Sequence, residues 1–220
     1  MAKFNFYHTD AAKLLAKIPE GKVDLIATDP PYGINYQSHV RATRFDYLEG
    51  DKKPETSWLP DAYRVLKDGG AMYCFTRFDV YPDWYKATVE AGFKVKNVLL
   101  WRKPGMGMGD LKGAYAYTTE MIIYAVKGRH ILRGAREGDV LEFPRENVQE
   151  YKHPTQKPVS LMAHLIEKSS DEGELVLDPF AGSGTTGVAA LRLGRDFLGC
   201  EIDEDYARLC MKRLKAEVSQ

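Results

Sequence analysis

The chain has 220 residues and a mass of 24.9 kDa, which suits one domain with a full hydrophobic core. Its hydrophobic share of 44% is typical of a globular protein, and its formal net charge of +0 excludes a strong overall basic field, so any nucleic-acid surface has to be local. No apolar stretch is long enough to cross a membrane and the first residues do not form a signal peptide, so we expect a cytoplasmic protein without a membrane partner.

The cysteines and histidines point neither to disulfides nor to a metal centre. Cys74, Cys200 and Cys210 lie in apolar segments without paired spacing, which is typical of buried thiols in a reducing compartment. The five histidines show no spacing that suits a metal ion. We therefore expect no metal site.

Strand-like and helix-like segments alternate along the whole chain. Seven strands are expected, at residues 3–8, 23–28, 71–75, 93–101, 119–126, 174–177 and 195–202. The helices between them are expected at residues 10–18, 58–67, 80–91, 158–170, 184–193 and 203–217. This alternation predicts an α/β fold with a doubly wound, mostly parallel seven-stranded sheet.

Three segments interrupt the alternation inside what we interpret as a single domain over residues 1–220. Residues 33–57 are long and polar, and we expect a lid-like loop there. Residues 102–118 and 128–155 are two small insertions rich in glycine and basic side chains.

The tetrapeptide Asp29-Pro30-Pro31-Tyr32 follows the apolar strand at residues 23–28. Open α/β sheets bind ligands at the carboxyl ends of their strands, where Asp29 supplies a hydrogen-bond acceptor. The prolines lack amide hydrogens and leave carbonyl oxygens free, and Tyr32 supplies a face for stacking. This set suits a planar substrate with an amino group, although a strand that simply meets a turn would look the same.

A glycine-rich stretch after the strand at residues 174–177 makes the functional interpretation the stronger one. It reads Asp178-Pro-Phe-Ala-Gly-Ser-Gly-Thr185 and opens a helix, which is the context of a nucleotide-binding turn. The leading carboxylate of Asp178 would repel a pyrophosphate but attract an ammonium or sulfonium group. Glu201 ends the next strand at roughly the 20-residue separation expected of an acid that binds ribose hydroxyls. The implied ligand is a positively charged nucleoside.

The two motifs together resemble those of S-adenosylmethionine-dependent DNA amino-methyltransferases, and their order resembles the circularly permuted beta group of that family. The resemblance spans nearly the whole chain and implies a Rossmann-like methyltransferase sheet with a small target-recognition insertion. It also implies the cofactor S-adenosylmethionine, the product S-adenosylhomocysteine and double-stranded DNA as the partner. By this resemblance the catalytic residues are Asp29, Pro30, Pro31 and Tyr32. The cofactor-binding residues are Asp10, Asp29, Lys157, Asp178, Pro179, Phe180, Ala181, Gly182, Ser183, Gly184, Thr185, Glu201, Ile202 and Asp203.

The resemblance also implies a mechanism. Hydrogen bonds from the exocyclic amine of a base to Asp29 and the Pro30 carbonyl would free the nitrogen lone pair for attack on a methyl sulfonium. The base would leave the duplex and stack on Tyr32. We expect the loops after Thr28 and Leu177 to lie over one crevice.

Candidate DNA contacts lie in the two insertions, in the family's target-recognition position. They are Trp101, Arg102, Lys103, Arg129, Arg133 and Arg136. A core tryptophan and an ordinary solvated basic run are the alternatives.

Adenine N6 is the expected target, because the family's adenine enzymes carry aspartate at the first position of the tetrapeptide. Cytosine N4, a catalytically idle DNA-binding module of the same fold, and methylation of RNA or protein stay open as alternatives. A small recognition region makes a homodimer possible.

Overall fold

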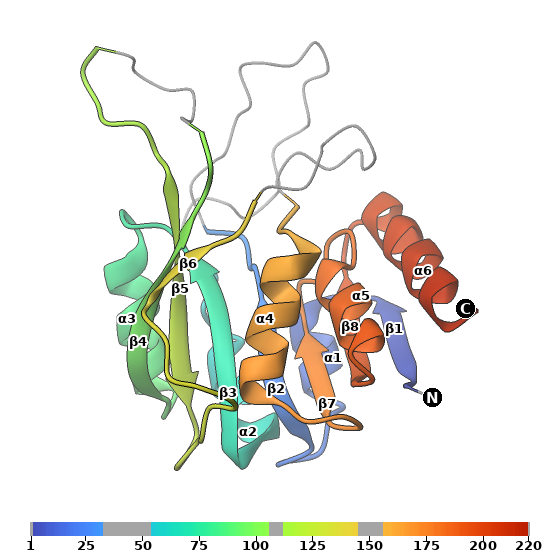
Figure 1. Ribbon diagram of the computed structural model, residues 1–220. Coiled ribbons are helices and arrows are strands. Elements are labelled where there is room, and N and C mark those ends of the chain that lie inside the picture. Colours follow the sequence, from blue (N-terminus) through green and yellow to red (C-terminus); the bar gives the residue numbers. More distant parts are fainter. Residues whose placement is uncertain (1, 33–53, 106–111, 145–155, 220) are drawn as a thin grey trace.

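A computed structural model describes residues 2–32, 54–105, 112–144 and 156–219, and these form one eight-stranded sheet with helices on both faces (Figure 1). The strands are β1 (Phe4–His8), β2 (Val23–Thr28), β3 (Leu66–Thr76), β4 (Lys94–Arg102), β5 (Thr119–Val126), β6 (Val140–Glu142), β7 (Leu175–Asp178) and β8 (Asp196–Glu201). The helices are α1 (Ala11–Leu15), α2 (Leu59–Val65), α3 (Tyr81–Glu90), α4 (Val159–Ser169), α5 (Thr185–Arg192) and α6 (Glu204–Val218).

The strand order is β1-β8-β7-β2-β3-β5-β4-β6. The first five strands in this order pair in parallel, whereas β5 is antiparallel to both β3 and β4. β6 pairs in parallel with β4 at the end of the sheet. The predicted doubly wound, mostly parallel α/β fold is confirmed, but the predicted count of seven strands is one too few.

The additional strand, β6, lies in residues 128–152, which the sequence indicated to be largely irregular, with a hairpin as an alternative. It pairs Val140, Leu141 and Glu142 with Leu100, Trp101 and Arg102 of β4. Only Leu141 of the three is buried. So short a strand forms because the edge of β4 offers hydrogen-bonding partners, and its own sequence pattern is too brief to predict it.

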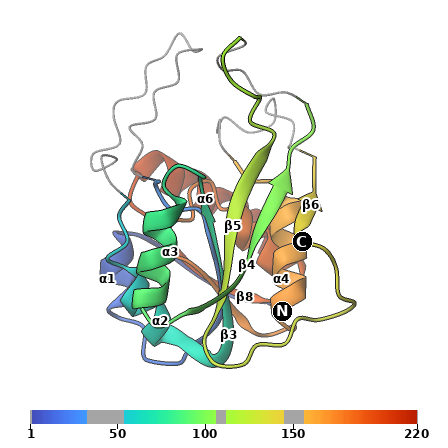
Figure 2. The ribbon, with the colours of Figure 1, turned by 90° about the vertical axis from the view of Figure 1, so that its left-hand side faces the viewer.

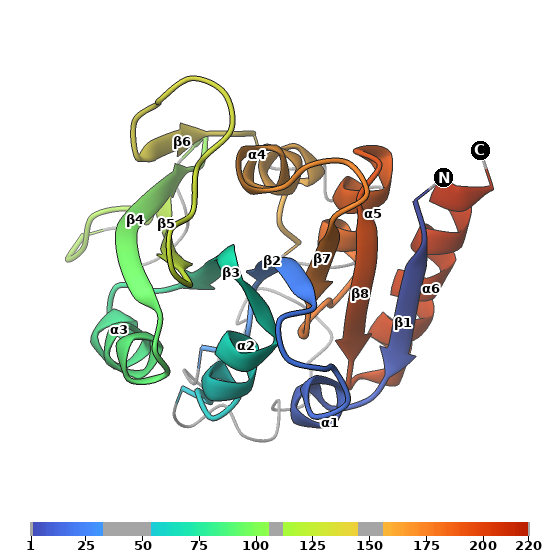
Figure 3. The same ribbon diagram turned by 90° about the horizontal axis from the view of Figure 1, so that it is seen from below.

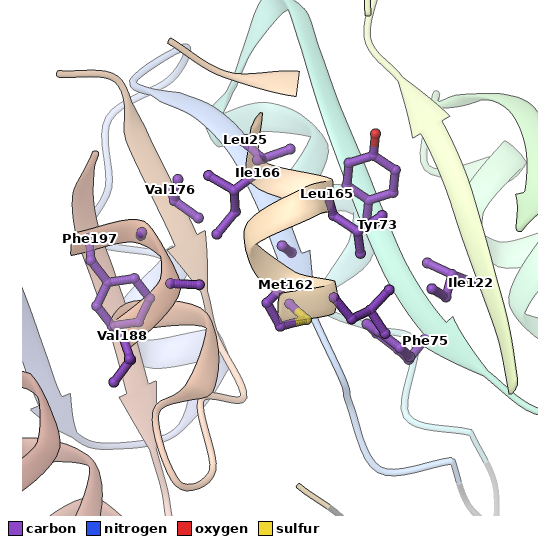
Figure 4. Packing of buried hydrophobic residues seen from close by; sticks show 14 of the residues in the cluster. Leu25, Tyr73, Phe75, Ile122, Met162, Leu165, Ile166, Val176, Val188 and Phe197 are labelled. Atoms are coloured by element: carbon purple, nitrogen blue, oxygen red, sulfur yellow. The ribbon is translucent and has the colours of Figure 1, made fainter. Parts of the chain in front are cut away.

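Two hydrophobic layers hold the helices against the sheet. Figure 3 shows α4 and α5 on one face, with α6 beside β8 and β1, and α1, α2 and α3 on the other face. Figure 4 shows the first layer, in which α4 sets Met162, Leu165 and Ile166 against Leu25 and Tyr73 of the sheet. The strand β2 is apolar almost throughout because both of its faces are covered.

The boundaries of several elements differ from the predicted ones. The helix expected to run to residue 67 ends at Val65, and the chain enters β3 at once. Lys67 instead extends its ammonium to Asp24, 2.5 Å away. Position 70 of β3 requires glycine, because a Cβ there would approach the Leu66 side chain to 2.8 Å and the Asp24 carbonyl oxygen to 2.9 Å.

The antiparallel direction of β5 decides which end of the sheet each insertion reaches. The connection from β4 to β5 starts at the carboxyl ends of the parallel strands, and Figure 2 shows this hairpin rising above the sheet. The chain after β5 leaves at the opposite end and returns to the carboxyl end only through β6. Most of the predicted lid, residues 33–53, lies outside the described residues, as do residues 106–111 and 145–155 of the two insertions.

Candidate functional site

The two motif loops lie side by side at the centre of the sheet. They follow β2 and β7, which are paired parallel neighbours (Figure 1). The chain runs outward from this point in both directions, to β3 on one side and to β8 and β1 on the other, so it is the topological switch point of the sheet. The Thr28 hydroxyl at the end of β2 donates a 2.7 Å hydrogen bond to Asp178 Oδ1. The prediction that these two loops meet over one crevice is confirmed in their position.

Asp178 is buried, with 3% of its surface exposed, and both of its oxygens accept hydrogen bonds. Oδ1 accepts from Thr28 and from the Phe180 amide, and Oδ2 accepts from the Thr186 hydroxyl at 2.6 Å. Burial raises the pKa of Asp178 to about 6, against the opposing effect of these hydrogen bonds. The carboxylate therefore ties the end of β2 to the start of α5.

The glycine-rich turn uses its two glycines for different purposes. Gly184 has φ +87°, and a Cβ there would come within 2.7 Å of Cys210 Sγ on α6, so only glycine fits. Gly182 has φ +52°, and nothing lies within 4 Å of where its Cβ would be. The space beside Gly182 is thus open to a ligand, whereas Gly184 packs the turn against α6.

Main-chain amides hold the acids of this region. Glu201 accepts hydrogen bonds from the amides of Gly182, Ile202 and Asp203. Asp10 caps α1 by accepting from the amides of Ala12 and Lys13. Asp203 likewise caps α6.

The other predicted cofactor residues line or support the same turn. The Ala181 amide donates to the Cys200 carbonyl, and the Pro179 carbonyl accepts the Cys200 thiol. Phe180 packs edge-on against Trp58, with ring centroids 5.3 Å apart, and Ile202 is exposed. Ser183 donates to Gln156.

This turn fits the predicted cationic nucleoside. The Thr185 hydroxyl is buried and has no hydrogen-bond partner among the described residues, so it can bond a ligand. Open space lies beside Gly182, and Asp10, Asp178 and Glu201 supply negative charge from three neighbouring strand ends. Such a set suits S-adenosylmethionine and would repel a pyrophosphate.

Asp29, at the end of β2, is held through both carboxylate oxygens. The Tyr32 hydroxyl donates to Oδ1 at 2.5 Å, and the Lys157 ammonium donates to Oδ2 at 2.5 Å. Burial and the Asp29 charge raise the pKa of Tyr32 well above its ordinary value, so its hydroxyl stays protonated. Pro30 is buried and Pro31 exposed.

Lys157 lies beside the tetrapeptide that begins at Asp29, although the sequence placed it among the cofactor residues. Its ammonium, besides bonding Asp29, lies 3.1 Å from Oε2 of Glu120 at the start of β5. Sequence reasoning missed Glu120, because a charge at the start of an apolar strand usually faces solvent. The alternation of side chains along the strand could have identified it, since Glu120 lies on the same face of β5 as the buried residues Ile122 and Tyr124.

Of the predicted DNA contacts, three lie at the carboxyl end of β4, near the catalytic end of the sheet. Arg102 is exposed and pairs with Glu142, and Lys103 is largely buried and pairs with Glu120 at 2.7 Å. Trp101 is only 2% exposed, and its indole donates to the Phe143 carbonyl. Trp101 is therefore a core residue, which is the alternative that the sequence left open for it.

The other three predicted DNA contacts do not join the site. Arg133 pairs with Asp171 and Glu174 just before β7, and its amide bonds the Lys168 carbonyl at the end of α4. Arg129 lies beside the start of β3, and Arg136 is exposed in the chain that returns along α4. The structure thus sets Arg129 and Arg133 at the end of the sheet opposite Asp29, because they follow the antiparallel strand β5.

Exposed aromatic residues at the catalytic end were also missed. Phe78, just after β3, stacks on Tyr117, just before β5, with centroids 5.8 Å apart and rings 22° from parallel. Both rings are more than half exposed, and Tyr115 nearby is almost fully exposed. Their spacing in the sequence gives no sign of this pairing, which depends on the neighbouring positions of β3 and β5.

Neither a metal centre nor a membrane-spanning helix is found among the described residues. They contain no group of three or more histidine, cysteine or acidic side chains that could hold a metal ion. None of the helices in this part of the chain has the length and apolar character needed to cross a membrane.

Comparison with known proteins identifies the family. The family model described as DNA methylase matches residues 23–212. The type II methyltransferase M2.DpnII of Streptococcus pneumoniae is 32% identical, over 98% of this chain and 91% of the relative. The DNA adenine methyltransferase YhdJ of Escherichia coli is 33% identical, over 94% and 81%. The solved M1.HpyAVI-SAM complex superposes with a TM-score of 0.78 at 25% identity, over 96% of this chain and 98% of that one.

These matches cover both motif loops and almost all of the sheet. They confirm the predicted resemblance to DNA amino-methyltransferases, while the assignment to the permuted beta group stays a prediction. The chain belongs to the DNA methylase family.

Proposed function

We propose that this protein transfers a methyl group from S-adenosylmethionine to the N6 amine of an adenine flipped out of double-stranded DNA. The observation that carries the proposal is the 2.7 Å hydrogen bond between Thr28 and Asp178, which joins the Asp29 tetrapeptide to the glycine-rich turn. The SAM complex of M1.HpyAVI supports the cofactor, and the adenine specificity of YhdJ supports the target base.

The chain's own residues position the target amine. Asp29, with one donor on each oxygen, keeps its remaining lone pairs for one hydrogen of the amine, and the Pro30 carbonyl accepts the other. Those hydrogen bonds turn the nitrogen lone pair out of the ring system and towards the cofactor turn. Tyr32 supplies a face on which the flipped base stacks.

The residues of the glycine-rich turn would hold the cofactor. Asp178 and Glu201 supply negative charge, and Gly182 and Thr185 supply open space and a free hydroxyl. When bound, S-adenosylmethionine supplies a methyl group whose carbon–sulfur bond breaks with its electron pair on sulfur as the nitrogen–carbon bond forms, leaving S-adenosylhomocysteine and one proton.

The DNA surface is the catalytic end of the sheet. Arg102 is exposed there and can reach a phosphate, and the stacked pair of Phe78 and Tyr117 offers apolar faces to bases. This assignment replaces Arg129 and Arg133, which face the opposite end.

A homodimer is the assembly we favour. The segment between β4 and β5 runs only from residue 103 to residue 118, so a second copy would extend the surface available to a duplex. Light scattering on the purified protein gives the answer directly: twice the chain mass supports the dimer and the single-chain mass contradicts it.

The class of acceptor is tested with S-adenosylmethionine carrying a labelled methyl group. Duplex DNA of mixed sequence, RNA of the same sequence and unrelated protein are offered in parallel to the wild-type chain and to Asp29→Ala. We expect label in DNA alone with the wild type, and loss of transfer in Asp29→Ala with cofactor affinity, measured by calorimetry, within about threefold.

Other outcomes overturn this proposal. Label in RNA or protein would move the activity to another acceptor. Unchanged turnover by Asp29→Ala would remove Asp29 from the mechanism. Cofactor binding by the wild type without transfer to any acceptor would indicate an idle DNA-binding module.

A further inference from the structure

Four side chains of alternating charge form a chain across the catalytic end of the sheet. Lys103 of the hairpin contacts Glu120 at 2.7 Å, Glu120 contacts Lys157 at 3.1 Å, and Lys157 contacts Asp29 at 2.5 Å. They come from the end of β4, the start of β5, the approach to α4 and the end of β2. Segments far apart in the sequence therefore converge on the tetrapeptide.

These charges are withdrawn from water. The exposed fraction of the side chain is 12% for Lys103, 22% for Glu120, 9% for Lys157 and 30% for Asp29. Burial alone would lower the pKa of Lys157, but Asp29 and Glu120 outweigh it and raise that pKa. Burial likewise opposes ionisation of Glu120, yet Lys157 and Lys103 lower its pKa to about 2. Buried ion pairs contribute little net stability, so stability alone does not explain this chain of charges.

The position of the Lys157 ammonium indicates a role in orienting Asp29. Its ammonium lies over the Phe75 ring, 4.9 Å from the centroid, and 6.0 Å from the centroid of Tyr32. From there it bonds Asp29 Oδ2 while the Tyr32 hydroxyl bonds Oδ1. With a donor on each oxygen, the carboxylate cannot rotate without losing a hydrogen bond, so its remaining lone pairs point in fixed directions.

We propose that Lys157 is a positioning residue that fixes the orientation of the Asp29 carboxylate that receives the target amine. Glu120 fixes the position of Lys157 through their ion pair, and the ion pair of Lys103 with Glu120 connects this arrangement to the hairpin between β4 and β5. The inference rests on the proposed function, because it assigns Asp29 the role of amine acceptor. It differs from the cofactor contact that the sequence suggested for Lys157.

The Lys157 ammonium also affects how the Asp29 carboxylate can interact with the target amine. A carboxylate that already accepts one hydrogen bond on each oxygen still has lone pairs for a further donor. Asp29 therefore orients the amine, and the proton released in the reaction leaves to water. The other titratable groups that face Asp29 are Tyr32, Cys74 on β3 and Asp178 on β7, with Glu120 behind Lys157.

Lys157→Met tests the role, and Lys67→Met is the matched control. Lys67 also makes a 2.5 Å ion pair, with Asp24, but at the opposite end of β2. We expect Lys157→Met to lower kcat about 100-fold while KM and calorimetric affinity for S-adenosylmethionine change less than threefold. Lys157→Arg should recover part of kcat, and Lys67→Met should match the wild type.

The conservative variant separates positioning from general damage. Lys157→Arg keeps a cation beside Asp29 and Glu120, so its kcat should lie well above that of Lys157→Met. An equal loss of kcat in both variants would indicate general damage and would overturn the proposal. So would an unchanged kcat, or a normal kcat with cofactor affinity weakened more than tenfold.

A double-mutant cycle tests the contact without any activity. The melting temperatures of Asp29→Asn, Lys157→Met and the double variant are compared, and Glu120→Gln with Lys157→Met gives a second cycle should the first fail to fold. We expect the double variants to lose less than the sum of the single losses, because each single change strands a buried charge. If the falls in melting temperature are additive, the proposal is overturned even when the wild type methylates DNA. If they are coupled but the wild type is inactive, only the proposed function is overturned.

Discussion

Asp178 is the residue on which the two motif loops depend. Its carboxylate accepts from Thr28 on one side and Thr186 on the other, and it is almost wholly buried. Sequence reasoning identified Asp178 as a negative charge for a cationic ligand. The structure adds that the same charge bridges two loops, which requires hydroxyls at positions 28 and 186 that no motif distinguished beforehand.

The pKa of about 6 for Asp178 makes cofactor affinity pH-dependent in the range where the enzyme can be studied. A cationic ligand binds the carboxylate better than the neutral acid, so affinity should fall as the pH drops through about 6, roughly tenfold between pH 7 and pH 5. Calorimetric titration with S-adenosylmethionine measures it. Asp178→Asn should bind weakly and with a flat profile over the same range, and a flat profile in the wild type would contradict the assignment.

Stability of the free protein should move in the opposite direction. The folded pKa of Asp178 lies above the ordinary value near 3.9, so the folded state favours the protonated acid. That contribution is fully present below about pH 4 and is lost as the pH rises through about 6, at a cost of about 3 kcal/mol. Urea unfolding of the wild type and of Asp178→Asn at pH 4.5 and 7.5 isolates this difference.

At the scale of elements, the antiparallel strand β5 determines which basic residues can meet DNA. The sequence suggested DNA contacts at Arg129, Arg133 and Arg136 because this basic segment occupies the family's target-recognition position. An apolar strand reads the same in either direction, so its direction could not be predicted from its residues. The segment instead leaves at the far end of the sheet.

Arg102 and Arg133 therefore form a matched pair of test positions. Arg102→Ala should weaken DNA binding and lower the slope of log affinity against log salt by about one, because one phosphate contact is lost. Arg133→Ala removes an arginine beside Asp171 and Glu174, at the end of the sheet opposite Asp29, so it should leave that slope unchanged. Fluorescence anisotropy over a salt series gives both slopes, and a reversed pattern would return the DNA surface to the opposite end.

At the scale of the whole molecule, the order of strands and helices along the chain was predictable from the sequence, whereas the direction of β5 in the sheet was not. The alternation of apolar strands and helices predicted the fold class, and the loops after Thr28 and Leu177 were correctly expected to lie side by side. Strand β6 escaped prediction because three residues carry no period. Glu120 and the link from Lys157 to Asp29 escaped because they depend on contacts across three separate segments.

The order of the two motifs along the chain has a structural consequence for the whole molecule. The tetrapeptide after β2 comes early in the chain and the glycine-rich turn after β7 comes late, yet the two strands are neighbours. Methyl transfer in this arrangement depends on the central pairing of β2 with β7, which brings both loops to one end of the sheet.

The most direct test of the central claim is the nucleoside composition of duplex DNA after incubation with the wild-type protein and S-adenosylmethionine. The account predicts N6-methyladenine, formed by the wild type and absent with Asp29→Ala. N4-methylcytosine as the product would preserve the arrangement of the site but contradict the assignment of adenine as its target.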